Sequence, residues 1–324
     1  MDTSAHHTKN TSLQALRFVF VMFIVMSHFS YREVAAFDAG GDGGVAFFFL
    51  LSGFAMSMGY GQSIVDGTFS FKRYAKRRLL KVYPLHLLCL AIFLIVFRPV
   101  ADLRLPINAL LLQSWIPDGD YYFSYNGVAW FLSDVLFCYL LFPLVYRHAG
   151  RLLLVGLLLA CLAVYIVVPY SQINALLYVF PPVRFVDFFL GIMLYKFYVR
   201  RQNEPITPYA EPLLVVLLIL AVIAYPFADE KFRNAPLFWI VFLPFIYVFA
   251  KQQGPVSHML QRPLFQWLGS LSMPIFMFHP MVFRTLFHFF PAIPSMLMLA
   301  LALSLTLMVS WATDRLLLQY TNKF

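Results

Sequence analysis

The chain has 324 residues, of which 61% are apolar and only 12% are charged, and its net charge is +9. Soluble globular proteins carry about 25% charged residues, so this composition excludes an ordinary soluble domain. Apolar runs of about 18 residues or more recur along the chain, which is typical of a membrane protein with several spans. We therefore expect an all-α fold, a polytopic helical bundle in which residues 1–324 form one transmembrane domain.

The apolar runs predict ten transmembrane helices, with both termini in the cytoplasm. The first run lacks a small-residue cleavage site, so we expect a retained helix and not a signal peptide that is removed. In this topology most Lys and Arg residues face the cytoplasm, and the positive-inside rule explains the basic charge without nucleic acid as a partner. The predicted spans are 13–31, 43–60, 79–98, 128–147, 151–169, 182–199, 211–227, 235–250, 270–289 and 294–318.

The first predicted helix contains two ionisable side chains, Arg17 and His28. They are 11 residues apart, which is three helical turns plus about 20°, so they project from the same face about 16 Å apart. Each has a structural explanation on its own, because Arg17 can extend to lipid headgroups and His28 can be a buried structural histidine. Together they predict a polar stripe that faces the interior of the bundle.

The next two predicted helices begin with unusual sequences. GGDGG at 40–44 precedes FFFLLSGF at 47–54, and glycine at such places permits close approach of either a ligand or another helix. FKRYAKRRLLK at 71–81 is the only dense cytoplasmic group of cations in the predicted topology. Guanidinium groups suit phosphate binding, although contact with anionic lipids explains some of these charges equally well.

The longest predicted outer loop, 99–127, contains a short apolar stretch that is re-entrant or interfacial, since it is too short to span a membrane. Several aromatic residues follow it and either anchor the chain at the membrane interface or form a lip on which a sugar stacks. These aromatic residues are Tyr121, Tyr122, Tyr125 and Trp130.

Further ionisable residues lie within the later spans, where such groups usually face a cavity or one another. Asp134 has no cation within helical reach and needs a partner on another helix, for which His28 or an arginine is expected. Arg184 and Asp187 are three residues apart and are expected to neutralise each other. His279 precedes Pro280 and is equally compatible with a structural and a functional role. The other two are Arg284 and Asp314, and Cys89, Cys138 and Cys161 are expected to be buried packing residues.

In combination these segments resemble the acyltransferase-3 family of membrane enzymes. The family's first signature is a basic residue, ten residues and a histidine, here Arg17 and His28. The chain departs from the usual family pattern at Ala46, Asp134 and Met273. The other matching blocks, in the family's order, are FFFLLSGF (47–54), RLLKVYP (78–84), WFLSDVLFCYLLFP (130–143), FPPVRFVDFFLGIML (180–194) and LGSLSMPIFMFHP (268–280).

The resemblance implies transfer of an acyl group, expected to be acetyl, from cytoplasmic acyl-CoA to a hydroxyl of a cell-envelope or secreted carbohydrate. It also implies an integral protein of a bacterial cytoplasmic (inner) membrane, in contact with membrane lipid. The implied acceptor is a saccharide or a lipid-linked glycan, and no metal is expected. A transporter or flippase for a polar glycan or lipid is the alternative, because inward-facing charges serve a transport path equally well.

The resemblance also assigns roles to residues of this chain. His28 is the expected general base, because neutral imidazole accepts a proton near pH 7, and Asp134 is expected to orient its ring or stabilise the imidazolium. Arg17 is expected to contact the CoA arm or the developing oxyanion. The residues expected to bind acyl-CoA are Arg78, Lys81, Arg77, Arg73, Ser52 and Gly53, and those expected to bind the acceptor are Trp130, Arg184 and His279.

Overall fold

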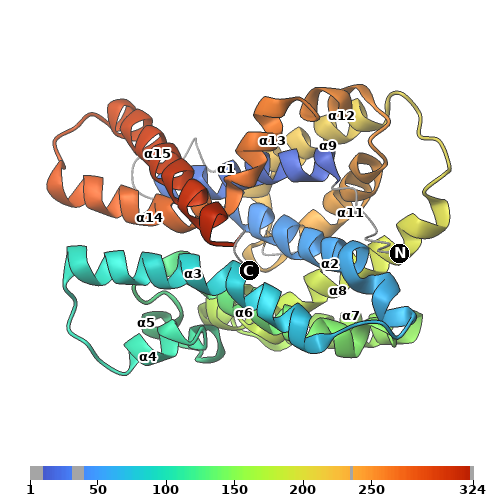
Figure 1. Ribbon diagram of the computed structural model, residues 1–324, viewed down its shortest axis with the longest axis horizontal. Helices are drawn as coiled ribbons and strands as arrows, with labels where there is room; N and C mark the ends of the chain where they lie inside the picture. Colours follow the sequence, from blue (N-terminus) through green and yellow to red (C-terminus); the bar gives the residue numbers. More distant parts are fainter. Residues whose placement is uncertain (1–9, 31–39, 234–235, 322–324) are drawn as a thin grey trace.

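The computed structural model describes residues 10–30, 40–233 and 236–321, and the described chain is helical throughout, with no strand (Figure 1). Ten long helices coincide one by one with the ten predicted spans. They are α1 (Thr11–Ser30), α2 (Gly41–Val65), α3 (Phe71–Phe97), α6 (Trp130–Tyr146), α7 (Arg151–Val167), α8 (Pro181–Arg201), α9 (Ala210–Ala224), α11 (Pro236–Lys251), α14 (Ser272–Phe289) and α15 (Ser295–Thr321).

Seven helices in the described part of the chain are long and apolar enough to cross a membrane. The number is eight if α7 and the following segment Tyr170–Tyr178, which are inclined to each other by 119°, form one span. The helices α8 and α14 are less apolar, because α8 carries several charged residues and α14 carries two histidines, an arginine and two prolines. The all-helical architecture is thus confirmed, whereas ten crossings and cytoplasmic termini stay predictions.

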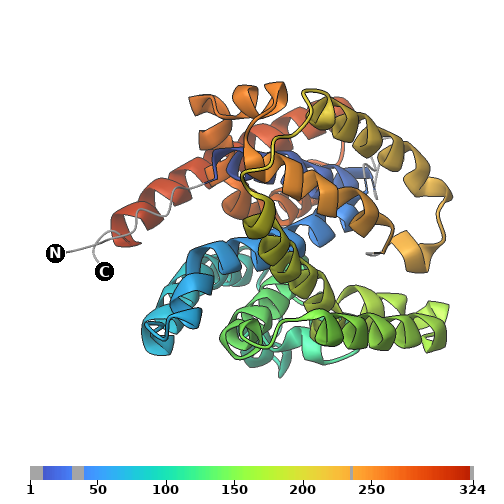
Figure 2. The ribbon, with the colours of Figure 1, turned by 90° about the vertical axis from the view of Figure 1, so that its right-hand side faces the viewer.

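The helix α2 lies at the centre of the bundle. Helices α3 to α7 lie on one side of it, whereas α9 and α11 to α15 lie on the other (Figures 1 and 2). It packs most extensively against α8. At this crossing a Cβ atom on Gly53 would overlap the carbonyl oxygen of Phe188, and one on Gly191 would overlap that of Leu50. The two glycines therefore let the two backbones touch, as small residues do between membrane helices.

Aromatic side chains fill much of the space around α1 and α2. Phe20 of α1 stacks on Phe47 of α2 with ring centroids 3.7 Å apart, and Phe242 of α11 lies edge-on to both rings. All three are completely buried. Edge-to-face and stacked pairs of this kind add about 0.5–1.5 kcal/mol each beyond the area that they bury, so they fix α1 against α2 and α11.

The segment 99–127 folds into short helices, α4 (Arg104–Ala109) and α5 (Gly119–Tyr122), which pack inward against α3 and α6. Its buried polar residues bond to the neighbouring elements. His86 of α3 contacts the carbonyl of Asn108 at 2.9 Å, and Ser114 donates to the carbonyl of Trp130 at 3.0 Å. The loop therefore forms a fixed wall of the bundle.

The shorter helices α12 (Pro255–Leu260) and α13 (Pro263–Ser270) close the end of the bundle at which α1 begins. Asn10 caps α1 by accepting a bond from the Leu13 amide and donates to the carbonyl of Ala250. Glu211 is completely buried and accepts bonds from the amides of Gly254 and Ser257. The three cysteines are buried and free, as expected.

The close approach of α2 and α8 makes Gly53 intolerant of any side chain. We expect Gly53→Ala to lower the stability of the purified protein by about 1–3 kcal/mol, the usual effect of overpacking, measured by thermal unfolding in detergent. Gly59→Ala on the same helix is the matched control, because no atom lies within 4 Å of the added Cβ and alanine favours a helix by about 0.5–1 kcal/mol. Equal melting temperatures for the two variants would contradict the tight crossing.

Candidate active site

Two cavities lie at the two ends of α1. The first, here called the Arg17 cavity, has a volume of about 210 Å³ and is lined by residues of α1, α2, α3, α6 and α14. The second, the His28 cavity, has a volume of about 460 Å³ and is lined by the other end of α1, by α14 and by the segment around Tyr125. The predicted polar stripe on α1 thus opens into two separate cavities.

The Arg17 cavity brings together Arg17, Ser52 and Lys81, three residues that the sequence assigns to the site. Most of its other lining residues are apolar, among them Met56 and Met273. None of the ion pairs found in the described residues involves Arg17. A guanidinium without a carboxylate beside it, in largely apolar surroundings, is a favourable place for an anionic group of a ligand.

His28 lies in the other cavity, beside His279. Its Nδ1 is 2.8 Å from the carbonyl oxygen of Ile24 and 3.3 Å from Nε2 of His279. His279 is completely buried, and its own Nδ1 lies 3.1 Å from the carbonyl oxygen of Ile275. The two histidine rings are edge-to-face, with centroids 4.9 Å apart.

These contacts assign the tautomers of both rings. A carbonyl oxygen only accepts hydrogen bonds, so Nδ1 of each histidine carries the hydrogen and Nε2 carries the lone pair. Nδ1–H of His28 is then shared between Ile24 and the Nε2 lone pair of His279. This arrangement leaves Nε2 of His28 as the basic nitrogen, which is the form that a general base requires.

One helix, α14, lines both cavities. Phe276 lines the Arg17 cavity, and from Pro280, one turn later, to Arg284 and Phe287 the helix lines the His28 cavity. Between them His279 packs against Phe276, with ring centroids 6.1 Å apart, and Phe131 packs against the other side of Phe276 at 5.2 Å. Along α14, His279 therefore lies between the residues that line the two cavities.

Contrary to expectation, Asp134 forms no hydrogen bond or ion pair with His28 or with an arginine among the described residues. It is completely buried on α6, and neither carboxylate oxygen has a hydrogen-bond partner in the parts of the chain that the structure describes. It lines neither cavity. His279 takes the place beside His28 that the sequence analysis gave to Asp134.

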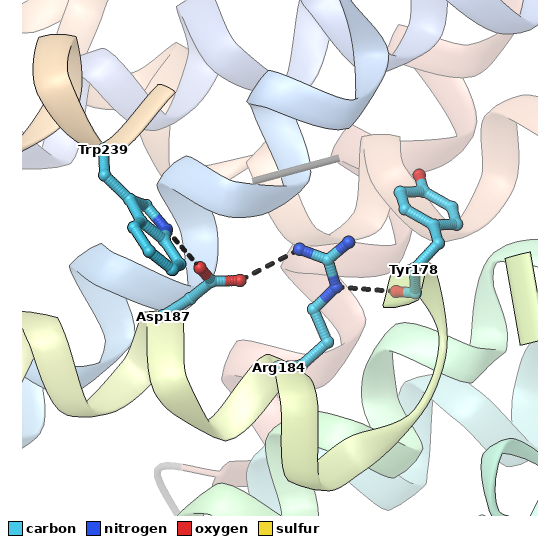
Figure 3. Close-up of polar contacts among 4 residues, drawn as sticks. All are labelled: Tyr178, Arg184, Asp187 and Trp239. Atoms are coloured by element: carbon cyan, nitrogen blue, oxygen red, sulfur yellow. Dashed lines mark hydrogen bonds and ion pairs between the residues drawn. The ribbon is translucent and has the colours of Figure 1, made fainter. Parts of the chain in front are cut away.

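The residues around Arg184 form a buried ion-pair network (Figure 3). Its Nη1 donates to Asp187 at 2.9 Å and its Nε donates to the carbonyl of Tyr178 at 2.6 Å, while the indole of Trp239 donates to the other oxygen of Asp187. Arg184 and Asp187 are both buried. The expected neutralisation is confirmed, and Arg184 lines neither cavity.

Three other predicted site residues pack against neighbouring parts of the bundle and line neither cavity: Trp130, Arg78 and Gly53. Trp130 is buried and its ring lies 4.8 Å from that of Tyr178. Arg78 donates to the hydroxyl of Tyr60 at 3.0 Å and lies over a group of tyrosine rings. Gly53 lies at the crossing of α2 and α8.

The basic residues at the start of α3 differ in where they point. Arg73 and Arg77 are exposed and line neither cavity. Arg78 turns inward and touches Met56 and Tyr139, which are themselves lining residues of the Arg17 cavity. Of the cations predicted to bind acyl-CoA in this segment, Lys81 alone lines the cavity, and Arg73, Arg77 and Arg78 do not.

The His28 cavity also contains polar groups that the sequence analysis did not assign to the site. Arg284 was noted only as an ionisable residue in a span, and Tyr125 only as an aromatic residue of the outer loop. Asn126 carries no signal in the sequence, because its position depends on the fold of the loop, where the preceding Tyr125 adopts a positive φ of 55°.

The chain belongs to the acyltransferase-3 family, because the family model described as "Acyltransferase domain" matches residues 10–315. Together with the apolar helices, this membership points to an integral membrane protein of the acyltransferase class.

Two curated proteins are similar to parts of the chain. Acyltransferase MdmB of Streptomyces mycarofaciens is 31% identical over 178 residues, which is 46% of this chain and 45% of that protein. Protein 2 in picA locus of Rhizobium radiobacter is 32% identical over 115 residues, or 35% of this chain and 58% of that protein. The matches thus span about half the length of these relatives. No solved structure matches the chain significantly.

The contact between His279 and His28 predicts that His279 positions the base. We expect His279→Leu, which removes the acceptor at Nε2, to lower kcat for acyl transfer about 10- to 100-fold with little change in KM, since small misplacements of a reacting group have effects of this size. His279→Gln keeps an acceptor at a similar distance from the backbone and should retain most of the activity. Equal losses in two folded variants would contradict this positioning role.

Proposed function

We propose that the protein is a membrane-embedded O-acyltransferase that moves an acyl group, expected to be acetyl, from acyl-CoA to a hydroxyl of a cell-envelope or secreted carbohydrate. The observation that carries the proposal is the placement of Arg17 and His28 on one helix, each in a cavity of its own. An anion-binding group at one end and a basic nitrogen at the other suit a charged donor and a hydroxyl acceptor that approach from opposite sides. Family membership supports the reaction class.

The Arg17 cavity is the proposed site for the acyl-CoA donor. CoA carries several phosphate charges and a long, weakly polar arm that ends in the thioester. Arg17 and Lys81 supply the positive charge, Ser52 supplies a hydroxyl, and the apolar walls suit the arm. In the predicted topology this cavity opens toward the cytoplasm, where acyl-CoA is found, and the exposed Arg73 and Arg77 lie at the same end of α3.

The proposed chemistry takes place at His28. Nε2 of His28 takes the proton from the acceptor hydroxyl as its oxygen attacks the thioester carbonyl carbon. A carbon–oxygen bond forms, the carbon–sulfur bond breaks, and the thiolate of CoA leaves and receives the proton from His28. His279 holds the ring of His28 through this exchange, because its Nε2 accepts the hydrogen bond from Nδ1.

The separation of the two residues favours one of the two roles expected for Arg17. Eleven residues of the continuous helix α1 place Arg17 about 16 Å from His28 along the axis. The oxyanion forms within bonding distance of the acceptor oxygen that His28 deprotonates, and an arginine side chain does not reach so far. We therefore assign Arg17 to binding the CoA arm and not to stabilising the oxyanion.

Removal of the proposed base tests the reaction directly. We expect His28→Ala to lower kcat for transfer from labelled acetyl-CoA to envelope saccharide acceptors by about 10²- to 10⁴-fold, the usual contribution of a general base. His258→Ala is the matched control, because His258 is exposed on α12 and lines neither cavity. The purified variants are compared for folding before their rates are measured.

Two outcomes would count against this proposal. Near-normal turnover by folded His28→Ala would contradict the role of the base. Flux of a glycan through proteoliposomes without acyl-CoA, together with no acyl transfer, would instead favour the transporter or flippase alternative.

Substitution of Arg17 should change a different kinetic constant from substitution of His28. We expect Arg17→Gln to raise KM for acetyl-CoA about 10- to 100-fold, because hydrogen bonds to charged groups contribute about 1.5–3 kcal/mol, and to leave kcat at saturating donor much less affected. The measurement is initial rate against acetyl-CoA concentration. A lower kcat with unchanged KM would contradict the assignment of Arg17 to the donor.

A further inference from the structure

One wall of the His28 cavity carries a guanidinium that pairs with no carboxylate of the described residues. Arg284 lies over the rings of Phe93 and Phe97, at 4.9 and 4.6 Å from their centroids. It forms no ion pair with any described residue. Because α14 packs against α3, these two rings of α3 hold the guanidinium between the helices, so that it faces the cavity.

Arg284 lies where two cavities meet. It lines the His28 cavity and also a neighbouring cavity of about 310 Å³, and Phe93 and Tyr125 line both as well. The neighbouring 310 Å³ cavity contains another arginine, Arg104, which forms an ion pair with Asp102 at 2.5 Å. Across the joined space, Arg284 is thus the cation whose charge no carboxylate of the described chain neutralises.

Tyr125 and Asn126 line the same cavity as Arg284. The hydroxyl of Tyr125 and Oδ1 of Asn126 are buried, have no hydrogen-bond partner in the described chain and are not accessible from the cavity. Asn126 is only 3% exposed and is held by a bond from its Nδ2 to the carbonyl of Met277 at 2.9 Å. This bond fixes the loop that forms one wall of the cavity.

The carboxylate in the His28 cavity does not cancel Arg284. Asp42 accepts a hydrogen bond from the hydroxyl of Tyr225 at 2.8 Å and lies in the first turn of α2, where the helix dipole stabilises negative charge. In the described chain no ion pair joins Asp42 to Arg284. The negative charge of Asp42 is therefore stabilised by Tyr225 and by the helix dipole, whereas no described carboxylate neutralises the positive charge of Arg284.

We propose that the His28 cavity binds an anionic saccharide, whose carboxylate or phosphate group pairs with Arg284. Arg284 lines the same cavity as His28 and follows the His28 neighbour His279 by five residues on α14, a rise of about 7.5 Å along the helix. The anion thus anchors the acceptor with a hydroxyl beside Nε2 of His28. A planar guanidinium suits both carboxylate and phosphate through paired hydrogen bonds.

This inference rests on the proposed acyl transfer, since it names the class of acceptor, but its test uses binding without turnover. The purified protein in a non-ionic detergent is titrated with methyl glucuronide, glucose 1-phosphate and the neutral methyl glucoside, and binding is followed by ligand-observed NMR. We expect at least one of the two anionic sugars to bind about tenfold or more tightly than the glucoside. Arg284→Gln should abolish this difference, whereas Arg262→Gln, an exposed cation on α13's N-terminal flank, should preserve it.

The two anionic probes also identify the anion, because a preference for one of them distinguishes a carboxylate from a phosphate. If Arg284→Gln does not fold, Arg284→Met provides the same comparison, since its apolar side chain can pack on Phe93 and Phe97.

Three results would overturn the inference: no preference for anionic sugars, a preference that survives loss of Arg284, or displacement of the sugars by phosphatidylglycerol vesicles but not by phosphatidylcholine vesicles. The last result would assign Arg284 to a lipid headgroup. A protein that binds the anionic sugar through Arg284 but transfers no acyl group would contradict the proposed transfer alone.

Discussion

A charged side chain buried in an apolar helical bundle needs an opposite charge or a ligand beside it, and the arrangement of this protein depends on that constraint. The charge of Arg184 is neutralised by another residue of the protein, Asp187, and the carbonyl of Tyr178 accepts a further hydrogen bond from it. Loss of one partner of such a buried pair typically costs about 3–5 kcal/mol, so this network ties α8 to α11 through Trp239. Among the described residues Arg17 and the exposed Arg284 have no carboxylate partner, and both line cavities. Pairing thus gives Arg184 a structural role, whereas the charges of Arg17 and Arg284 are not neutralised by the described part of the protein.

The two available arginines are placed by two helices that run side by side. The helices α1 and α14 are in contact along the bundle, and each contributes residues to both cavities. The contact between His28 and His279 lies between the cavities and joins the two helices. In the proposed mechanism the base His28 is therefore held by the same two helices that line the donor cavity and the acceptor cavity.

The helices themselves could be predicted from the sequence, because long apolar runs leave few alternatives to a membrane helix. The pairing of Arg184 with Asp187 was also predictable, since residues three apart are neighbours on one helix. That neither carboxylate oxygen of Asp134 has a hydrogen-bond partner in the described chain was not predictable, because the neighbours of Asp134 depend on which helices face each other. For the same reason the sequence could not distinguish Lys81, which lines the Arg17 cavity, from Arg73 and Arg77, which do not.

Motif residues are not all site residues, and Gly53 shows why. It lies within a signature segment, as Ser52 does, but adjacent positions on a helix point about 100° apart. Ser52 lines the Arg17 cavity, whereas Gly53 faces α8 and admits no side chain. One signature segment can therefore combine a residue that lines a cavity with the packing residue that holds the segment in place. The sequence pattern alone does not separate the two.

In the proposed reaction the thioester moves from the Arg17 cavity toward His28, along α14, which lines both cavities. Phe276 of this helix packs against both Phe131 and His279, and Pro280 follows directly after His279. Proline has no N–H to donate to the carbonyl of the residue four positions earlier, which is Phe276 itself. One helical hydrogen bond is therefore missing at the turn of α14 that lies between the two cavity linings. The backbones of α2 and α8, by contrast, touch at Gly53 and Gly191, so the proposed path follows a helix that is less constrained at this turn than the central crossing.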